Sequence, residues 1–116
     1  MKDFYDFLKI MGGMHDSIIA CFNWLSNEKR IEFFFEDMFN NFEGLPEYPG
    51  RQSGTIILHG VSALSIAIET AEKLRVFEFL PDQDEPDVVL IKFWPSGKIR
   101  VRFSSADYPC FYLQSV

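Results

Sequence analysis

The chain has 116 residues, of which 47% are hydrophobic and 13 are Phe, and its formal net charge at pH 7 is −6. This length fits one domain, and the apolar content excludes an intrinsically disordered chain. The negative charge argues against nucleic acid and anionic membranes as partners, because both are bound through Lys and Arg. It leaves open a basic protein partner, although the same charge also serves simply to keep a protein soluble.

Residues 3–11 are predicted to form a short amphipathic helix. Its apolar side chains recur at the spacing of one helical face, at Phe4, Phe7, Leu8 and Met11. Gly12-Gly13 is expected to end the helix with a left-handed C-cap. Because so short a helix is not stable alone, we expect residues 1–12 to dock on the rest of a single domain that spans 1–116.

Asp3 and Asp6 lie where a signal peptide would carry positive charge, and no apolar run approaches the ~18 residues of a membrane span. We therefore expect a cytoplasmic protein and no membrane association.

Cys21 and Cys110 form no C-x-x-C pair. In a reducing compartment both are expected to be buried thiols, with a Cys21–Cys110 disulfide as the alternative.

Alternating side chains predict a first hairpin after the helix. The first strand begins at Ser17 and continues to Trp24, with Ile18, Ala20, Phe22 and Trp24 on one face. A turn at 26–29 leads to a second strand, whose buried face carries Ile31, Phe33 and Phe35.

Residues 38–53 break this alternation, because Asn, Gly and Pro residues are spread through the segment. An excursion of this length is uncommon unless it is functional or packs down as a lid. Two interpretations follow. The aromatic and acidic side chains form a recognition loop, or Phe42, Leu45 and Tyr48 fold back and cap one end of the sheet.

Five more strands are predicted, at 55–59, 63–69, 74–80, 88–94 and 99–103. A helix over 62–74 is the alternative to the strand at 63–69. Phe77 and Phe79 are expected to share a face, and the strand at 88–94 is apolar on both faces, which is typical of a central strand. The tail at 108–113 is expected to add an edge strand.

The predicted fold class is α+β, mostly β. About seven strands joined by short connections indicate an antiparallel sheet curled into a sandwich or open barrel, with one short N-terminal helix. Apolar positions on both faces of several strands are explained by a homodimer or by a two-layered core, so the sequence leaves the oligomeric state open.

The motifs for catalysis, metal binding and cofactor binding are weak. His15-Asp16 resembles a metal-binding or acid–base pair, but the chain has only one other histidine, His59. A structural role is the alternative, in which His15 satisfies a nearby carbonyl. The acidic run from Asp82 to Asp87 lacks the Gly and Glu positions of a calcium loop. No nucleophile elbow or phosphate-binding loop is present. We therefore predict no catalytic residue, no metal and no cofactor.

Three segments carry a resemblance to known proteins: Gly13-Met14-His15-Asp16-Ser17-Ile18, the stretch from Asn41 to Gly50, and Leu58-His59-Gly60-Val61. Together they resemble small uncharacterised bacterial β-rich domains that open with a Gly-x-His-Asp-[Ser/Ala] segment. The resemblance covers Gly13 to Phe103. Some domains of this kind are grouped with immunity proteins that neutralise secreted toxins, and no functional residues can be transferred from them.

Two functional hypotheses remain. The first is a non-enzymatic, immunity-like interaction protein that binds a basic protein through its acidic loops. The second is a small-ligand-binding domain or enzyme with a pocket near His15, Asp16 and His59. The candidate binding residues are His15, Asp16, Phe42, Glu43, Glu47, Tyr48, Asp82, Asp84 and Glu85.

Overall fold

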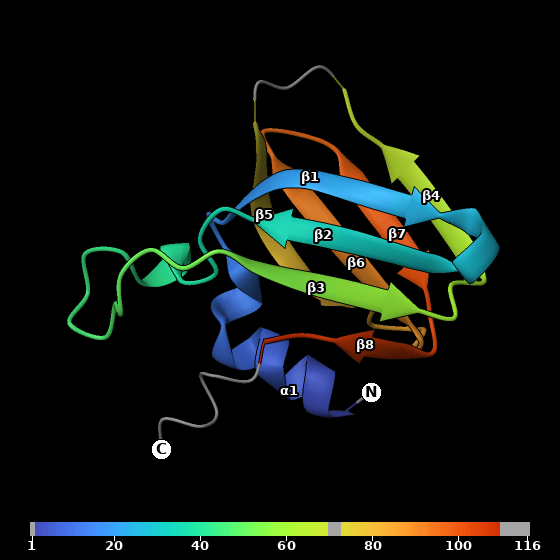
Figure 1. Cartoon of the computed structure of the whole chain (residues 1–116), viewed down its shortest axis with the longest axis horizontal. Helices are drawn as coiled ribbons and strands as arrows, with labels where there is room; N and C mark the ends of the chain where they lie inside the picture. The colour runs from blue at the N-terminus through green and yellow to red at the C-terminus, as the bar shows by residue number, and fades with distance from the viewer. Residues whose placement is uncertain (1, 70–72, 110–116) are drawn as a thin grey trace.

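The computed structural model describes residues 2–69 and 73–109. Within them it contains one α-helix, three short 3-10 helices and eight strands (Figure 1). In chain order they are α1 (Lys2–Ile10), η1 (Gly12–Met14), β1 (Ile18–Leu25), η2 (Ser26–Glu28), β2 (Arg30–Phe35), η3 (Asn40–Phe42), β3 (Gly54–His59), β4 (Ala63–Ala67), β5 (Leu74–Pro81), β6 (Val88–Trp94), β7 (Lys98–Arg102) and β8 (Ser105–Asp107). The mostly β fold with a short N-terminal helix is confirmed.

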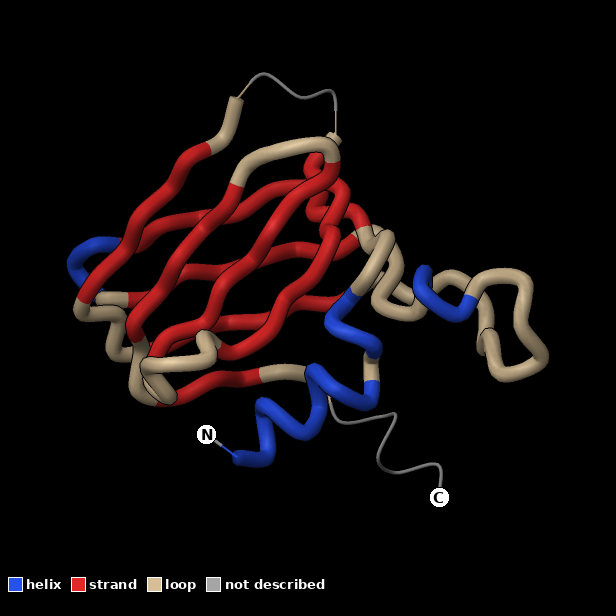
Figure 2. The backbone as a smooth tube through the Cα atoms, turned by 180° about the vertical axis from the view of Figure 1, so that it is seen from behind, coloured by secondary structure: helices blue, strands red, loops and turns tan. Residues whose placement is uncertain are grey.

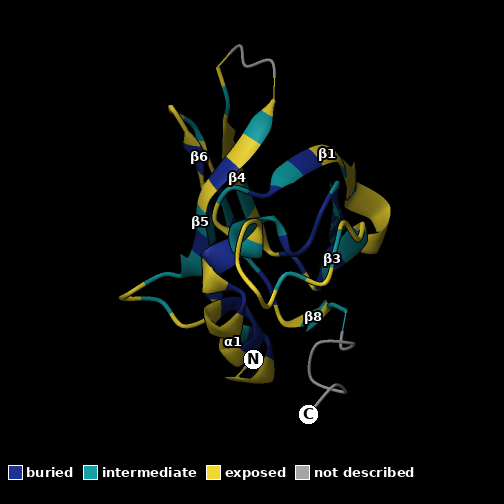
Figure 3. Cartoon of the chain, turned by 90° about the vertical axis from the view of Figure 1, so that its left-hand side faces the viewer, coloured by how far each residue is buried: buried dark blue, intermediate teal, exposed yellow. Residues whose placement is uncertain are grey.

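All eight described strands belong to one antiparallel sheet, in the order β4-β7-β6-β5-β1-β2-β3-β8. Two four-stranded halves meet between β1 and β5, where the ladder contains only Ile18 opposite Arg75 and Ile19 opposite Leu74. The sheet bends at this narrow joint, so the halves face each other across the core (Figure 3). It does not close into a barrel, and β4 and β8 remain as its two edges.

Helix α1 covers the open side of the bent sheet (Figure 2). Its predicted apolar face is buried: Phe4, Phe7, Leu8 and Met11 are each at most 3% exposed. The ring of Phe79 joins the layers, because it packs edge-on against Phe4 of the helix at 6.1 Å and against Phe33 of β2 at 6.0 Å. Such perpendicular ring pairs add to the free energy gained by burial alone. Helix α1 therefore packs on the sheet through this apolar face.

A bulge in β1 corrects the predicted faces of that strand. Ile19 lies opposite Phe35 and Phe22 lies opposite Phe33, with a register shift between Ile19 and Cys21. Because a bulge inserts one extra residue, it moves the following side chains to the other face. Ile19 and Phe22 therefore share the inner face, and the predicted continuous alternation from Ile18 is wrong.

A second bulge, between Val76 and Glu78, makes the prediction for β5 wrong as well. Phe79 is fully buried, whereas Phe77 is 42% exposed. The two rings therefore do not share a face. A sequence pattern with a period of two cannot reveal a bulge, because the position of the extra residue is set by the pairing with the neighbouring strand.

Cys21 follows the β1 bulge and is exposed, so the prediction that it is a buried thiol is wrong. Cys110, and with it the alternative Cys21–Cys110 disulfide, lies outside the described residues.

Three further expectations concern strands. Ala63–Ala67 forms strand β4 rather than a helix, as preferred, and β6 lies inside the sheet between β5 and β7, as expected for a central strand. The short strand β8, which pairs with β3, was not predicted. Of the predicted edge strand at 108–113, Tyr108 and Pro109 are outside any strand and the rest lies beyond the described residues.

Within residues 2–69 and 73–109, no helix combines the length and apolar character needed to cross a bilayer.

Candidate functional site

The excursion at 38–53 is closed at its base by Asp37, whose side chain is buried. Asp37 Oδ1 accepts hydrogen bonds from the backbone N–H groups of Phe39 at 3.0 Å and Gln52 at 3.2 Å. Its other oxygen accepts one from the Tyr48 hydroxyl at 2.6 Å. This hydrogen bond to Asp37 raises the pKa of Tyr48 to about 12, with smaller contributions from desolvation and nearby carboxylates. One carboxylate therefore joins both ends and the middle of the excursion.

The excursion has a packed side and an exposed tip. Phe39 is only 3% exposed, and the ring of Phe42 lies 6.4 Å from it, partly buried against the core. At the tip Leu45 is 50% exposed, and Glu43 and Glu47 are exposed on either side of it in sequence. The segment projects away from the sheet (Figure 1). Phe42 and Tyr48 fold back as the capping interpretation predicts, whereas Leu45 does not. Recognition by the exposed acidic tip stays a prediction.

The acidic loop between β5 and β6 is partly paired within the molecule. Asp82 accepts hydrogen bonds from the backbone N–H groups of Asp84 and Glu85, both at 3.0 Å. The Glu85 carboxylate accepts a hydrogen bond from Arg100 and lies 2.9 Å from Arg102. These arginines lie on the outer face of β7 beside β6, and no local sequence pattern pairs them with the loop. Only long-range pairing of the strands brings the charges together.

The excursion and the acidic loop do not form one face. The excursion leaves β2 after Phe35, which pairs with Ile19, and Ile19 in turn pairs with Leu74 at the start of β5. The acidic loop follows Pro81, at the other end of the same strand. Seven steps of about 3.3 Å separate the ends of an eight-residue strand, or about 23 Å. The structure therefore does not bring Glu43 and Glu47 together with the loop.

The two histidines are also apart. His15 donates a hydrogen bond from Nδ1 to the Phe77 carbonyl at 2.8 Å, and its Nε2 lies 3.6 Å from Asp16 Oδ2. His59 instead contacts Asp107, with Nε2 2.7 Å from the carboxylate oxygen. His15 precedes the start of β1. His59 is at the end of β3 and pairs with Arg30 of β2, which in turn pairs with Leu25, the last residue of β1. The two histidines thus lie at opposite ends of these strands and line no common pocket.

His15-Asp16 is held by an unusual run of backbone conformations. Gly12, Gly13, Met14 and Asp16 all have positive φ, between 57° and 67°. Gly12 ends the helix in the left-handed conformation that its sequence predicted. The turn aims the His15 ring at the bulged residue Phe77, with ring centroids 5.8 Å apart. The hydrogen bond to a carbonyl matches the structural alternative considered for His15.

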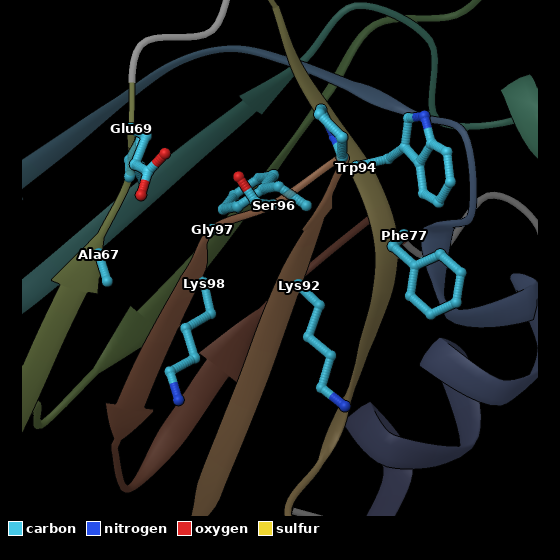
Figure 4. Close-up of a pocket in the computed structure, with 11 residues that line it drawn as sticks. Ala67, Glu69, Phe77, Lys92, Trp94, Ser96, Gly97 and Lys98 are labelled. Atoms are coloured by element: carbon cyan, nitrogen blue, oxygen red, sulfur yellow. The ribbon is translucent and has the colours of Figure 1, made fainter.

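An aromatic groove, which the sequence did not reveal, lies on the outer face of the β4-β7-β6-β5 half (Figure 4). Its volume is about 630 Å³, and it is lined by Phe77, Trp94, Lys92 and Lys98 together with the end of β4 and the turn at 95–97. Trp94 is 59% exposed, and its ring lies 6.5 Å from that of Phe77 with a tilt of 32°. The same two rings also line a smaller hollow of about 280 Å³ beside His15, Asp16 and Arg75.

The groove carries charges of both signs: Glu69 lines it together with Lys92 and Lys98, and Lys92 Nζ lies 3.8 Å from the Glu78 carboxylate. Lys92 lies directly opposite Lys98 in the β6–β7 ladder, and Figure 4 shows the two side chains extending side by side. Like charges placed directly opposite each other are unfavourable in a sheet. A sequence signal for this site was available in Lys92, whose charge marks the outward face of β6 and so places Trp94, two positions later, outward as well, but the β5 bulge concealed Phe77.

Ser17 is completely buried, and its hydroxyl has no hydrogen-bond partner within the described ranges. In the part of the chain that the structure describes, no three His, Cys, Asp or Glu side chains are grouped to hold a metal ion.

Comparisons of the chain with protein-family models, with curated proteins and with solved structures found no match. The resemblance to immunity-like domains therefore stays a prediction.

Proposed function

We propose that the chain is a non-enzymatic interaction protein that binds a basic protein partner through the tip of the 38–53 excursion. The observation that carries the proposal is the anchoring of this projecting segment by Asp37, which leaves Leu45 exposed between Glu43 and Glu47.

The anchored base lowers the entropic cost of binding. A free loop of this length would lose backbone entropy when it docks, whereas here the hydrogen bonds of Asp37 already order it. Leu45 supplies an apolar contact, and Glu43 and Glu47 supply charge around it. The complementary surface is an apolar pocket bordered by Lys or Arg. The net charge of −6 speeds the encounter with such a partner.

The acidic loop plays a lesser part in this proposal than the sequence suggested. Glu85 is paired with Arg100 and Arg102 and so is not available to a partner, whereas the exposed Asp84 adds only long-range attraction. An immunity-like role in the bacterial cytoplasm belongs to the same proposal, and its support is the resemblance of the three sequence segments described above.

The test is to capture binding proteins from the host and measure one of them in purified form. Wild-type protein is expected to bind a basic protein with an affinity that falls as salt rises. Leu45→Asp and the double variant Glu43→Lys/Glu47→Lys should each weaken binding at least tenfold. Asp84→Lys is the matched control, because it changes an exposed carboxylate in the other loop. If the tip variants bind as tightly as the control, the proposal is wrong.

A second candidate function, binding of a small ligand, is favoured by the exposed Trp94 in the aromatic groove. The small ligand would then bind beside Phe77 and Trp94, in a groove that neither His15 nor His59 lines. Lys92 and Lys98 supply positive charge for the anionic group of an aromatic molecule, and Glu78, 3.8 Å from Lys92, competes for Lys92 alone. Anilinonaphthalene sulfonate is a suitable probe, in a Trp24→Phe background that leaves Trp94 as the sole tryptophan. If the probe quenches Trp94 fluorescence equally in wild type and in Lys98→Glu, this function is excluded. His59→Ala is the control.

A further inference from the structure

The two edges of the sheet differ in how they are protected. Edge strand β8 has three residues and carries Asp107. Edge strand β4 has five residues, Ala-Leu-Ser-Ile-Ala, without a charge or a proline, and it pairs with β7 in unbroken register. Figure 2 shows it at the left-hand margin of the sheet, and no other described strand lies along its free side. Proteins usually block such an edge with charges, prolines or bulges, because its backbone groups can pair with another chain.

The side chains of β4 are also unusually open for apolar residues. Ile66 is 43% exposed, although it lies opposite the buried Ile99 of β7 and so faces the core side of the sheet. Leu64 faces the same side, opposite Val101. The outer face carries only the small side chains of Ala63, Ser65 and Ala67. The strand therefore presents an uncharged edge with an incompletely buried apolar side chain.

We infer that β4 pairs antiparallel with β4 of a second copy of this chain, around a two-fold axis at Ser65. In that register Ser65 lies opposite its own counterpart, Leu64 opposite Ile66, and Ala63 opposite Ala67. Large side chains thus meet on the core side and small ones on the outer side. No like charges oppose each other, although each copy carries a net charge of −6.

A second copy suits this edge because the five-residue strand reads with nearly the same chemistry in both directions. An isologous interface requires such self-complementarity, and the pairing would cover Ile66 and join two eight-stranded sheets. The inference goes beyond the proposed function and is independent of it, since the excursion projects from the side opposite β4 in Figure 1. Pairing at β4 leaves Glu43, Leu45 and Glu47 accessible.

Disulfide trapping tests the register directly. In a Cys21→Ser/Cys110→Ser background, Ser65→Cys places two thiols at the axis. Directly opposed residues of antiparallel strands have Cα atoms about 4.5–5.5 Å apart, within the range of about 4.4–6.8 Å that a disulfide accepts. Mild oxidation should give a covalent dimer at least tenfold faster than for Ser96→Cys, an exposed serine in the β6–β7 turn. Equal rates for the two variants would overturn the inference.

Sedimentation of the unmodified chain gives an independent measurement. The weight-average mass should rise with concentration toward that of a dimer, and Ile66→Lys should remove the rise. Because Ile66→Lys could reduce stability, Ser65→Lys on the outer face is a second variant, and urea unfolding identifies which of them remain folded. A wild-type mass that stays monomeric over the whole concentration range, or a folded β4 variant that dimerises as wild type does, would overturn the inference. Binding to the captured partner is expected to be unchanged in these variants, so this failure is distinguishable from failure of the proposed function.

Discussion

The hydroxyl of Tyr48 donates a 2.6 Å hydrogen bond to the carboxylate of Asp37, which is 6% exposed. Eleven positions separate the two residues, and the contact ties the middle of the excursion to its base. The same carboxylate accepts the N–H groups of Phe39 and Gln52. The shape of the excursion therefore depends on one buried side chain, and its stability can be tested there.

Asp37→Ala is expected to lower the free energy of unfolding by about 2–4 kcal/mol. It removes three hydrogen bonds to a charged acceptor and leaves their donors unpaired. Urea unfolding measures the loss. Glu43→Ala, at the exposed tip of the same excursion, is the control and should change stability by less than about 0.5 kcal/mol. Equal effects of the two substitutions would contradict the anchoring role of Asp37.

Tyr48 predicts a specific change of stability at high pH. Its hydrogen bond to Asp37 raises its pKa from 10.0 to about 12 in the folded protein. The folded state therefore holds the phenolic proton more tightly than the unfolded state. The stability gained from this difference is fully present below pH 10 and is lost as pH rises through about 12. Absorbance of tyrosinate should show that one tyrosine fewer ionises late in Tyr48→Phe than in wild type.

The free energy of unfolding provides the corresponding comparison. Tyr5 also has a raised pKa, caused by desolvation and the charge of Asp87, so the relevant quantity is the difference between wild type and Tyr48→Phe. That difference should shrink over the window from pH 10 to about 12. A difference that is constant over this window would show that Tyr48 does not retain its proton through Asp37.

The β5 bulge predicts opposite results for two neighbouring phenylalanines. Phe79→Ala should lower the free energy of unfolding by about 3–5 kcal/mol, because its fully buried ring contacts both Phe4 and Phe33. Phe77→Ala should cost at most about 1 kcal/mol, since the Phe77 ring is 42% exposed. Both are measured by chemical denaturation. Similar losses would place the two rings on one face and contradict the bulge.

Cys21 is expected to react with a thiol reagent in the folded protein, because it is exposed on β1. In a Cys110→Ser variant, the labelling rate without denaturant should be within a few-fold of the rate in urea. The same variant carrying Cys21→Ser supplies the blank. Protection by more than about a hundredfold, which corresponds to 2.7 kcal/mol of opening free energy, would mean that Cys21 is buried.

Local patterns in the sequence were enough for the elements themselves. The spacing from Phe4 to Met11 predicted the helix and its buried face, and the alternation of Ile31, Phe33 and Phe35 predicted β2 and its core side. Both patterns repeat with the period of their backbone, so they can be recognised without knowing any partner strand. The position of the excursion between β2 and β3 followed from its turn-forming residues in the same way.

Only the tertiary structure decided which side chains meet. The bulges at Ala20 and Phe77 depend on cross-strand pairing, and each changes which residue is exposed. Strand order places Arg100 and Arg102 against Glu85 and separates His15 from His59. It also places Lys92 opposite Lys98 beside Trp94.

The composition determined that this acidic, phenylalanine-rich chain would fold as a β-rich domain with a docked helix, because burial of apolar surface depends on residue content and local period. The positions of the turn-forming residues also located the excursion, at whose base Asp37 and Tyr48 meet. The contact between those two residues, and the surfaces left free around it, come from long-range pairing, whose register no local pattern contains.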